Sequence, residues 1–244
     1  MKVGLLANAK SKSCLSQELT ALHPVFTAVR FFDNVAYAVT FQRMDPFYVI
    51  DLTNPIPKIF GELNVTGFAE YLHPINAENT LILGLGQEAD ANGTVVGLQI
   101  SLFNAADRLH PKLIDRYVFE NNQNSWSGST AEWDPQAFRY LPIDSERGRL
   151  IIPLSTWKAD GSYFDGFVVL AVTPTSIDYL FNISHVQNTE QCFYCAYLSD
   201  RSFVINGDVI TLKGRSARSH NLTSGEEVWA VDFSWHSDMC CNWF

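Results

Sequence analysis

The chain has 244 residues, of which 47% are hydrophobic, 13% aromatic and 18% charged, and its formal net charge is −9. This length and apolar content suffice for one all-β domain with a sizeable core. Nucleic-acid binding needs clustered lysine and arginine, so the acidic balance argues against that class of partner. No apolar run approaches the roughly 20 residues of a membrane-spanning helix.

The N-terminal stretch MKVGLLANAKSKS has a lysine and a short apolar run. The run is too short for a signal peptide. Lys2–Leu6 is interpreted instead as the last strand of a repeat that precedes the chain.

Four short strands are predicted between Val29 and Leu63. Val29–Phe32 and Val35–Phe41 are rich in β-branched and aromatic residues and flank the turn residues Asp33 and Asn34. Phe47–Leu52 follows, and Thr53–Pro57 interrupts the pattern before a fourth strand, KIFGEL, because proline cannot donate to a strand ladder. Consecutive strands with short turns and no intervening helix indicate an antiparallel meander.

This four-strand pattern recurs three times along the chain. The second copy comprises Tyr71–Pro74, Leu81–Leu85, Gly97–Phe103 and Lys112–Phe119. The third comprises Ala137–Leu141, Leu150–Leu154, Phe167–Val172 and Ile177–Ile183. The fourth comprises Arg201–Ile205, an Asn-Gly turn, Val209–Leu212 and, as an outer strand, Glu227–Phe233. Repeats of four strands at roughly 40 to 60 residues are typical of β-propeller blades.

Several phrases of the sequence carry a family resemblance: VRFFDNVAYAVTF, DPFYVIDLTNP, PKIFGEL, GFAEYLHP, RGRLIIPL and RSFVINGDVITL. With them the chain resembles the microbial secreted proteins that have a C-terminal β-propeller domain, distantly related to WD-repeat propellers. The resemblance implies a propeller that is exported from the cell or held at its surface. It implies no catalytic residues.

We therefore predict an all-β protein with about four four-stranded blades over residues 28–235. Residues 1–27 are interpreted as a remnant of an upstream blade or an N-terminal extension, and residues 236–244 as a cysteine-containing tail. The blades could close a four-bladed ring, which removes exposed sheet edges. They could also be part of a larger propeller, with further blades or a second chain covering the end faces.

Five aromatic residues are the candidate binding face, because they gather in the loops around the third repeat: Trp126, Trp133, Tyr140, Trp157 and Tyr163. Exposed aromatic side chains on propeller loops suit contacts with a sugar or a protein. The alternative is that they pack between blades.

A candidate calcium site lies in the loop that contains Glu88, Asp90, Asn92 and Thr94. Oxygen-bearing side chains at alternate positions before Gly93 resemble the start of a calcium loop. The closing glutamate of an EF-hand would fall at Gln99, so the full pattern fails. The alternative is an acidic hairpin turn with an Asn-Gly signal.

The cysteines and glycosylation sequons bear on cellular location. In an exported protein the favoured interpretation is disulfide bonding among Cys192, Cys195, Cys240 and Cys241. Cys14 is then left over, and a zinc site that includes His236 is the less specific alternative. Four N-x-[ST] sequons are candidate glycosylation sites: Asn64, Asn92, Asn182 and Asn221.

No known catalytic motif is present in the sequence: it has no G-x-S-x-G, no H-E-x-x-H and no phosphate-binding glycine loop. The predicted function is therefore a secreted or cell-surface module that binds a protein or a carbohydrate. The alternative is a metal-dependent hydrolase or lactonase-type propeller with a cation in its central channel. Its candidate ligands are the histidines of three His-Pro dipeptides, His23, His73 and His110.

Overall fold

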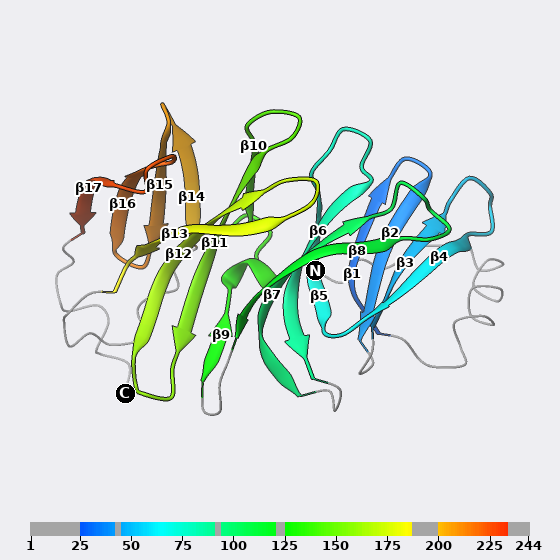
Figure 1. The fold of residues 1–244 in the computed structure, drawn as a ribbon, viewed down its shortest axis with the longest axis horizontal. Helices are drawn as coiled ribbons and strands as arrows, with labels where there is room; N and C mark the ends of the chain where they lie inside the picture. Colours follow the sequence, from blue (N-terminus) through cyan, green and yellow to red (C-terminus); the bar gives the residue numbers. More distant parts are fainter. Residues whose placement is uncertain (1–24, 42–44, 91–93, 121–124, 187–199, 234–244) are drawn as a thin grey trace. The chain divides into compact units, whose positions relative to one another are not determined.

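The structure is a computed structural model, and it describes residues 25–41, 45–90, 94–120, 125–186 and 200–233 (Figure 1). These residues form four antiparallel sheets and one short 3-10 helix. Four main strands of each sheet pair in chain order, which is the meander of a propeller blade. The predicted fold class is confirmed, and the four sheets are called blades one to four.

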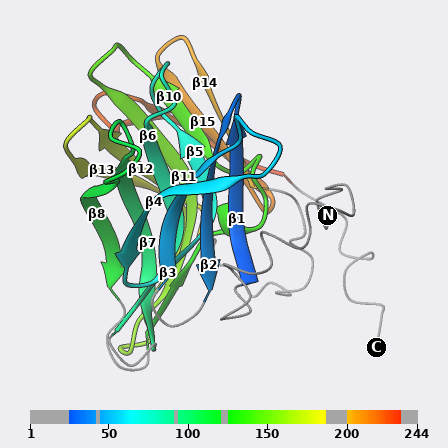
Figure 2. The ribbon, with the colours of Figure 1, turned by 90° about the vertical axis from the view of Figure 1, so that its right-hand side faces the viewer.

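Blade one contains β1 (Val25–Phe32), β2 (Val35–Phe41), β3 (Asp45–Asp51) and β4 (Lys58–Val65). Figure 2 shows β1, β2 and β3 side by side. Asp33 takes a positive φ of 46°, which a turn aspartate tolerates, and the turn sets Phe32 opposite Val35. Strand β1 begins three residues before the predicted start of the blades at residue 28.

Blade two contains β5 (Phe68–Pro74), β6 (Leu81–Ala89), β7 (Val95–Asn104) and β8 (Lys112–Glu120). The two central strands, β6 and β7, are buried almost continuously. The Asn76 carboxamide oxygen accepts hydrogen bonds from the backbone of Thr80 and Leu81 at 2.9 and 2.8 Å, and so closes the turn between β5 and β6.

Blade three contains β10 (Arg139–Pro142), β11 (Gly148–Trp157), β12 (Tyr163–Val172) and β13 (Ile177–Ser184). It also has two elements absent from the sequence prediction, β9 (Trp126–Gly128) and the 3-10 helix η1 (Thr130–Glu132). Strands β9 and β10 pair with opposite ends of β11. Residues 129–138 therefore form a connection between two strands that share one neighbour.

Blade four contains β14 (Arg201–Ile205), β15 (Asp208–Lys213), β16 (Ser216–Asn221) and β17 (Glu227–Asp232). Asn206 and Gly207 both have positive φ, 53° and 87°, which a two-residue hairpin turn of type I′ requires. The polar strand β16 is the one that the sequence left undefined.

The chain divides into two compact units. The first extends to Arg116 except for Val96–Leu98, and the second contains those three residues and the chain from Tyr117 onward. The core of the first unit includes the stacked rings of Tyr37, Phe47 and Phe103, with centroid distances of 5.6 and 4.5 Å. In the second unit a separate core joins blades three and four. Within the described ranges, no helix is long and apolar enough to cross a bilayer.

Candidate functional site

Three of the five candidate aromatic residues lie in one line across blade three. Trp157, the last residue of β11, is opposite Trp126 of β9 on one side and Tyr163 of β12 on the other. Directly opposed residues of antiparallel strands project to the same face of the sheet. The three side chains are 52%, 50% and 38% exposed for Trp126, Trp157 and Tyr163, and we call them the aromatic row. The Trp157 and Tyr163 ring centroids are 6.1 Å apart.

Trp126 lies back along its own strand, over Gly128. Residues two apart in a strand share a face, and a Cβ added to Gly128 would overlap the six-membered ring of Trp126. The indole therefore uses the space that the missing side chain leaves. Trp126 nevertheless remains 52% exposed.

A row of three further residues lies on the same face of the sheet, two residues along each strand from the aromatic row, and we call it the polar row. Gly128, Ser155 and Asp165 are opposite one another in register. The Ser155 hydroxyl donates a hydrogen bond to the Asp165 carboxylate at 2.5 Å. Burial, and then the charge of Asp165 and a hydrogen bond to it, raise the pKa of Tyr163 to about 12. The Tyr163 hydroxyl is thus a donor at any physiological pH.

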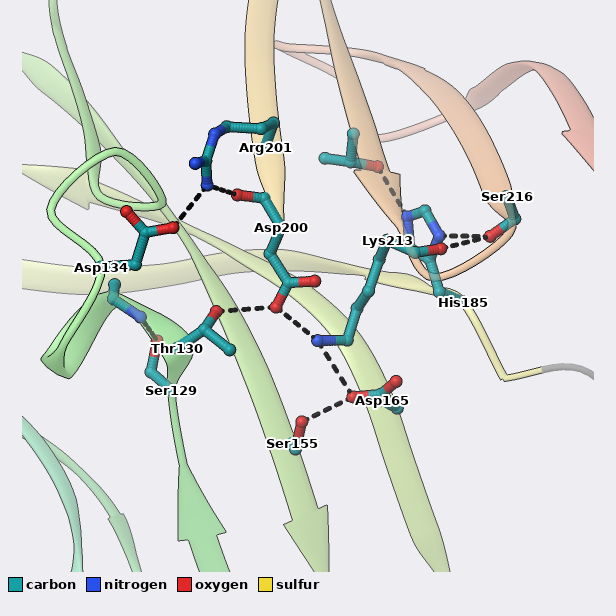
Figure 3. Close-up of polar contacts among 12 residues, drawn as sticks. Ser129, Thr130, Asp134, Ser155, Asp165, His185, Asp200, Arg201, Lys213 and Ser216 are labelled. Carbon is teal, nitrogen blue, oxygen red and sulfur yellow. Dashed lines mark hydrogen bonds and ion pairs between the residues drawn. The ribbon is translucent and has the colours of Figure 1, made fainter. Parts of the chain in front are cut away.

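Blade four supplies an ammonium group to this polar row (Figure 3). The Lys213 Nζ is 2.7 Å from Asp200 Oδ2 and 3.2 Å from Asp165 Oδ1. The side chains of Lys213, Asp200 and Asp165 are 10%, 5% and 27% exposed. Buried charges are retained only when they are paired. We call these three residues the charge cluster, which has one negative charge in excess.

The connection between β9 and β10 is fastened to blade four. The Thr130 hydroxyl donates to Asp200 Oδ2 at 2.7 Å, and the Arg201 guanidinium donates to Asp134 at 2.7 Å and Gln136 at 2.8 Å. Ser129 forms a capping box with the last residue of η1. Figure 3 shows Thr130 and Asp134 facing Asp200 and Arg201 of blade four.

The other two aromatic candidates lie outside the row. Trp133 ends η1 and is 68% exposed, and it makes no ring contact within the described part of the chain. Tyr140 is on β10, opposite Leu150, seven residues before Trp157 along β11. It is half-buried, and its ring covers Gly148, so it is a packing residue.

His185 is a buried residue that connects blade three to blade four, and nothing in the sequence indicates this role. Its Nδ1 is 2.6 Å from the Ser216 hydroxyl and its Nε2 is 2.8 Å from the Thr211 hydroxyl. Burial, helped by the nearby charges of Arg218 and Lys213, lowers the pKa of His185 to about 3. The imidazole is therefore neutral and joins the end of blade three to β15 and β16.

The two described histidines of the proposed channel set have different environments. His73 on β5 is half-buried, and burial followed by the charge of Arg30 lowers its pKa to about 4. His110 is exposed and pairs with Asp107 at 3.0 Å. His23 lies outside the described residues. Among the residues that the structure describes, no group of three or more His, Cys, Asp or Glu is arranged to hold a metal ion.

The loop of the proposed calcium site is described in part. The Glu88 carboxylate pairs with Arg116 of β8. The Asp90 carboxylate accepts a hydrogen bond from the Thr94 backbone at 2.9 Å and so closes the turn. Asn92 lies outside the described residues, and calcium binding stays a prediction.

The remaining sequence-based candidates divide into described and undescribed residues. Asn64 on β4 and Asn182 on β13 are exposed. The Asn221 side-chain oxygen accepts hydrogen bonds from the backbone of Thr223 and Ser224 at 3.0 and 2.9 Å. The four cysteines predicted to form disulfides lie outside the described residues: Cys192, Cys195, Cys240 and Cys241.

Sequence reasoning found the rings of the site and missed its polar groups. The alternation of Tyr163, Asp165 and Phe167 along β12 is the one local signal that places Asp165 on the same face as the row. Gly128, Asp200 and Lys213 give no such signal, because each reaches the site through strand pairing or blade packing.

Known proteins share the sequence pattern over much of the chain. Residues 17–225 match the model of a family described as a beta propeller domain. The uncharacterized protein MJ1554 of Methanocaldococcus jannaschii is 44% identical over 113 residues, which cover 46% of this chain and 15% of that protein. An uncharacterized protein of Archaeoglobus fulgidus is 40% identical over 144 residues, which cover 59% of this chain and 21% of that protein. The chain thus spans less than a quarter of these curated relatives.

Solved structures with a similar backbone include AztD of Citrobacter koseri, with 9% identity and a TM-score of 0.47 over 86% of this chain and 47% of that chain. Sqt1 of Saccharomyces cerevisiae has 9% identity and a TM-score of 0.42 over 86% of this chain and 48% of that chain. Similarity at this level carries no argument about the site.

Proposed function

The chain belongs to the beta propeller domain family, and on this fold we propose that it acts as a binding module whose contact surface is the aromatic row. The ligand is a protein or a carbohydrate. The module works outside the cell or at its surface, as the family resemblance implies.

The observation that carries the proposal is the register of Trp126, Trp157 and Tyr163. Three large rings on adjacent strands face the same side and remain substantially exposed. Exposing such apolar area to water is unfavourable, and contiguous patches of this kind mark interaction surfaces. Strand pairing already fixes the backbone beneath the rings, so a ligand meets a surface that loses little conformational freedom on binding.

The polar groups beside the row are suited to binding. Ser155 donates to Asp165, and Lys213 lies between two carboxylates. Tyr163 keeps its proton up to about pH 12. Ser155 and Lys213 hold the Asp165 carboxylate in place, which suits a fixed hydrogen-bond acceptor for a bound ligand.

The test is a ligand screen with matched variants. Wild type and the triple variant Trp126→Ala, Trp157→Ala and Tyr163→Ala are applied to arrays of glycans and extracellular proteins. A ligand of the row should lose at least about tenfold in affinity with the triple variant, since each buried aromatic contact contributes on the order of 1 kcal/mol or more.

The control is Tyr179→Ala, which removes a ring of comparable exposure, 47%, from β13. Tyr179 is opposite Leu170, seven residues along β12 from Tyr163. Ligands that bind wild type and the triple variant equally would contradict the proposal.

The external location has its own test. Asn64 and Asn182 are exposed sequons, which is compatible with passage through a glycosylating pathway. Immunoblots of culture medium, surface and cytosolic fractions of the source cells locate the protein, and glycan removal should shift its mobility. Detection in the cytosol alone would contradict this part of the proposal.

A further inference from the structure

We infer that the aromatic row binds a neutral saccharide chain laid across the strands, with Asp165 as a hydrogen-bond acceptor and Lys213 as the group that suppresses attraction of cations. This inference rests on the proposed function and narrows it from two ligand classes to one. Three features of the row support it: ring orientation, length and charge.

The ring orientation follows from Gly128. Because the Trp126 ring occupies the space above this glycine, the indole folds back over the strand instead of projecting straight out from it. The apolar C–H face of a sugar ring can stack on an indole held in this way, whereas an upright ring edge offers little contact area. Trp126 remains 52% exposed, so the ring is accessible.

The length of the row suits an extended ligand. Adjacent strands are about 4.8 Å apart, so three positions in register span about 10 Å. The row continues from β9 through β11 to β12 without a step to another sheet. A ligand that contacts all three rings therefore runs across the strands over more than one ring-sized unit.

The polar groups beside the rings are suited to hydroxyl groups. Tyr163 offers a protonated hydroxyl, and the Asp165 carboxylate, 27% exposed, is fixed by Ser155 and Lys213. A carboxylate has room for about four hydrogen bonds. A sugar hydroxyl that donates to it forms a charge-assisted hydrogen bond, which is about twice as strong as a neutral one.

The charge pattern disfavours ionic ligands. The positive charge of Lys213 balances the negative charge of Asp165. The remaining negative charge of the cluster is that of Asp200, which is only 5% exposed. A cationic ligand therefore gains little attraction from Asp165, because Lys213 already balances the charge of this carboxylate. An anionic ligand cannot reach Lys213, which is 10% exposed and has carboxylates on both sides. A neutral polyhydroxyl ligand is the class that remains.

The first experiment compares polymers of different charge by affinity electrophoresis and calorimetry. The probes are hydroxyethyl cellulose and glucomannan as neutral chains, chitosan as a cationic chain, alginate as an anionic chain, and polylysine as a cationic polypeptide. At least one neutral chain should bind most tightly. Its affinity should change less than about twofold between about 0.05 M and about 0.5 M NaCl, since salt screens only charge attraction.

The second experiment removes the groups one at a time. Trp157→Ala and Asp165→Asn should each weaken binding of the neutral chain about tenfold. Lys213→Met should reverse the preference, so that chitosan gains affinity while the neutral chain loses it. Since Lys213→Met leaves two carboxylates unpaired, the double variant Lys213→Met with Asp200→Asn keeps the charge balance of the cluster, frees Asp165, and should show the same gain for chitosan.

The outcomes separate the ligand class from the binding surface. If chitosan, polylysine or a protein binds wild type best and Trp157→Ala abolishes that binding, the row is a binding surface but the saccharide inference is wrong. If Trp157→Ala leaves the binding of every probe unchanged, the proposed function itself fails. Unaltered probe preference in the double variant would refute the role of Lys213.

Discussion

Gly128 determines whether the Trp126 ring can fold back over its own strand, because the indole occupies the volume that any side chain at position 128 would fill. Glycine weakens a strand interior, so its presence in β9 needs a reason. At the scale of single residues, the space for the ring is that reason.

Gly128→Val should turn the Trp126 ring away from the sheet and weaken binding of the row's ligand about tenfold. The thermal midpoint should change little, since valine favours strand geometry. Calorimetric titration and a thermal melt measure the two quantities. Gly161→Asn is the control: Gly161 has a positive φ of 81° that asparagine tolerates, and nothing lies within 4 Å of an added Cβ. Equal loss of binding in both variants would refute this role for Gly128.

His185 links protonation to stability. Its pKa is about 3 in the folded protein, against an ordinary value of 6.5. The unfolded chain therefore binds a proton more readily than the folded one between these values. Stability contributed by the neutral imidazole is complete above pH 6.5 and is lost as the pH falls toward about 3.

His185→Gln should flatten this acid dependence. Wild type should lose about 3 kcal/mol of unfolding free energy through this group between pH 6.5 and about pH 4, at about 1.4 kcal/mol per unit. Urea titrations at several pH values measure the slope. Asn182→Gln, at an exposed position without a titratable group, should keep the wild-type slope. An unchanged slope in His185→Gln would show that other groups cause the acid lability.

At the scale of elements, the connection between β9 and β10 is held by blade four as well as by its own strand pairs. Arg201 donates to Asp134 and Gln136 across the two blades, and their ion pair is about one quarter exposed. Such partly buried hydrogen bonds to a charged group contribute more than surface ion pairs.

Arg201→Met should therefore lower the unfolding free energy by about 1–2 kcal/mol. The same change at Arg147, whose pair with Asp144 is mostly exposed, should cost much less, because water screens the two charges. Urea unfolding of the two variants compares the sites directly. Equal costs would mean that the tie to blade four adds no stability.

Periodicity explains which elements the sequence reveals. Strands β2, β6 and β12 are rich in β-branched or aliphatic residues, and their prediction is confirmed. Strand β16 reads SARSHN and lacks that signal, although four of its six residues are buried. Strand β9 has three residues, and their partners on β11 are 27 to 31 positions further along the chain. Tertiary packing defines both strands, so local pattern misses them.

In the candidate site, too, local sequence pattern reveals some residues and tertiary packing determines the others. Composition indicates an aromatic cluster, but only the register set by the hairpin between Trp157 and Tyr163 selects its members. A shift by one residue would turn Tyr163 to the opposite face. Asp200 and Lys213 join the site through blade packing, and a single sequence shows no trace of that packing.

At the scale of the whole molecule, the two compact units can be observed separately. All six tryptophans lie at or after position 126, so indole fluorescence reports on the second unit. The backbone signal in circular dichroism reports on both. Strand β7 contributes residues to each unit, because Val96–Leu98 group with the second and Gln99–Asn104 with the first.

We expect urea transitions followed by fluorescence and by far-ultraviolet circular dichroism to coincide. Strand β7 has residues in both units, so it cannot stay intact when one unit unfolds. Unfolding of one unit should therefore destabilise the other. Measuring both signals on the same samples makes the comparison. A circular-dichroism transition that precedes the fluorescence transition would show that the units unfold independently.

The divided edge of blade three has a consequence for divergence and engineering. Because β9 and β10 end on separate parts of β11, the exposed positions within residues 129–138, such as Trp133 and Pro135, can vary without moving either strand pair. Insertions or replacements at these exposed positions leave the sheet register unchanged, provided that the contacts of Thr130 and Asp134 with blade four and the buried Ala131, Ala137 and Phe138 are kept. New specificities can therefore be grafted at this position beside a constant aromatic row.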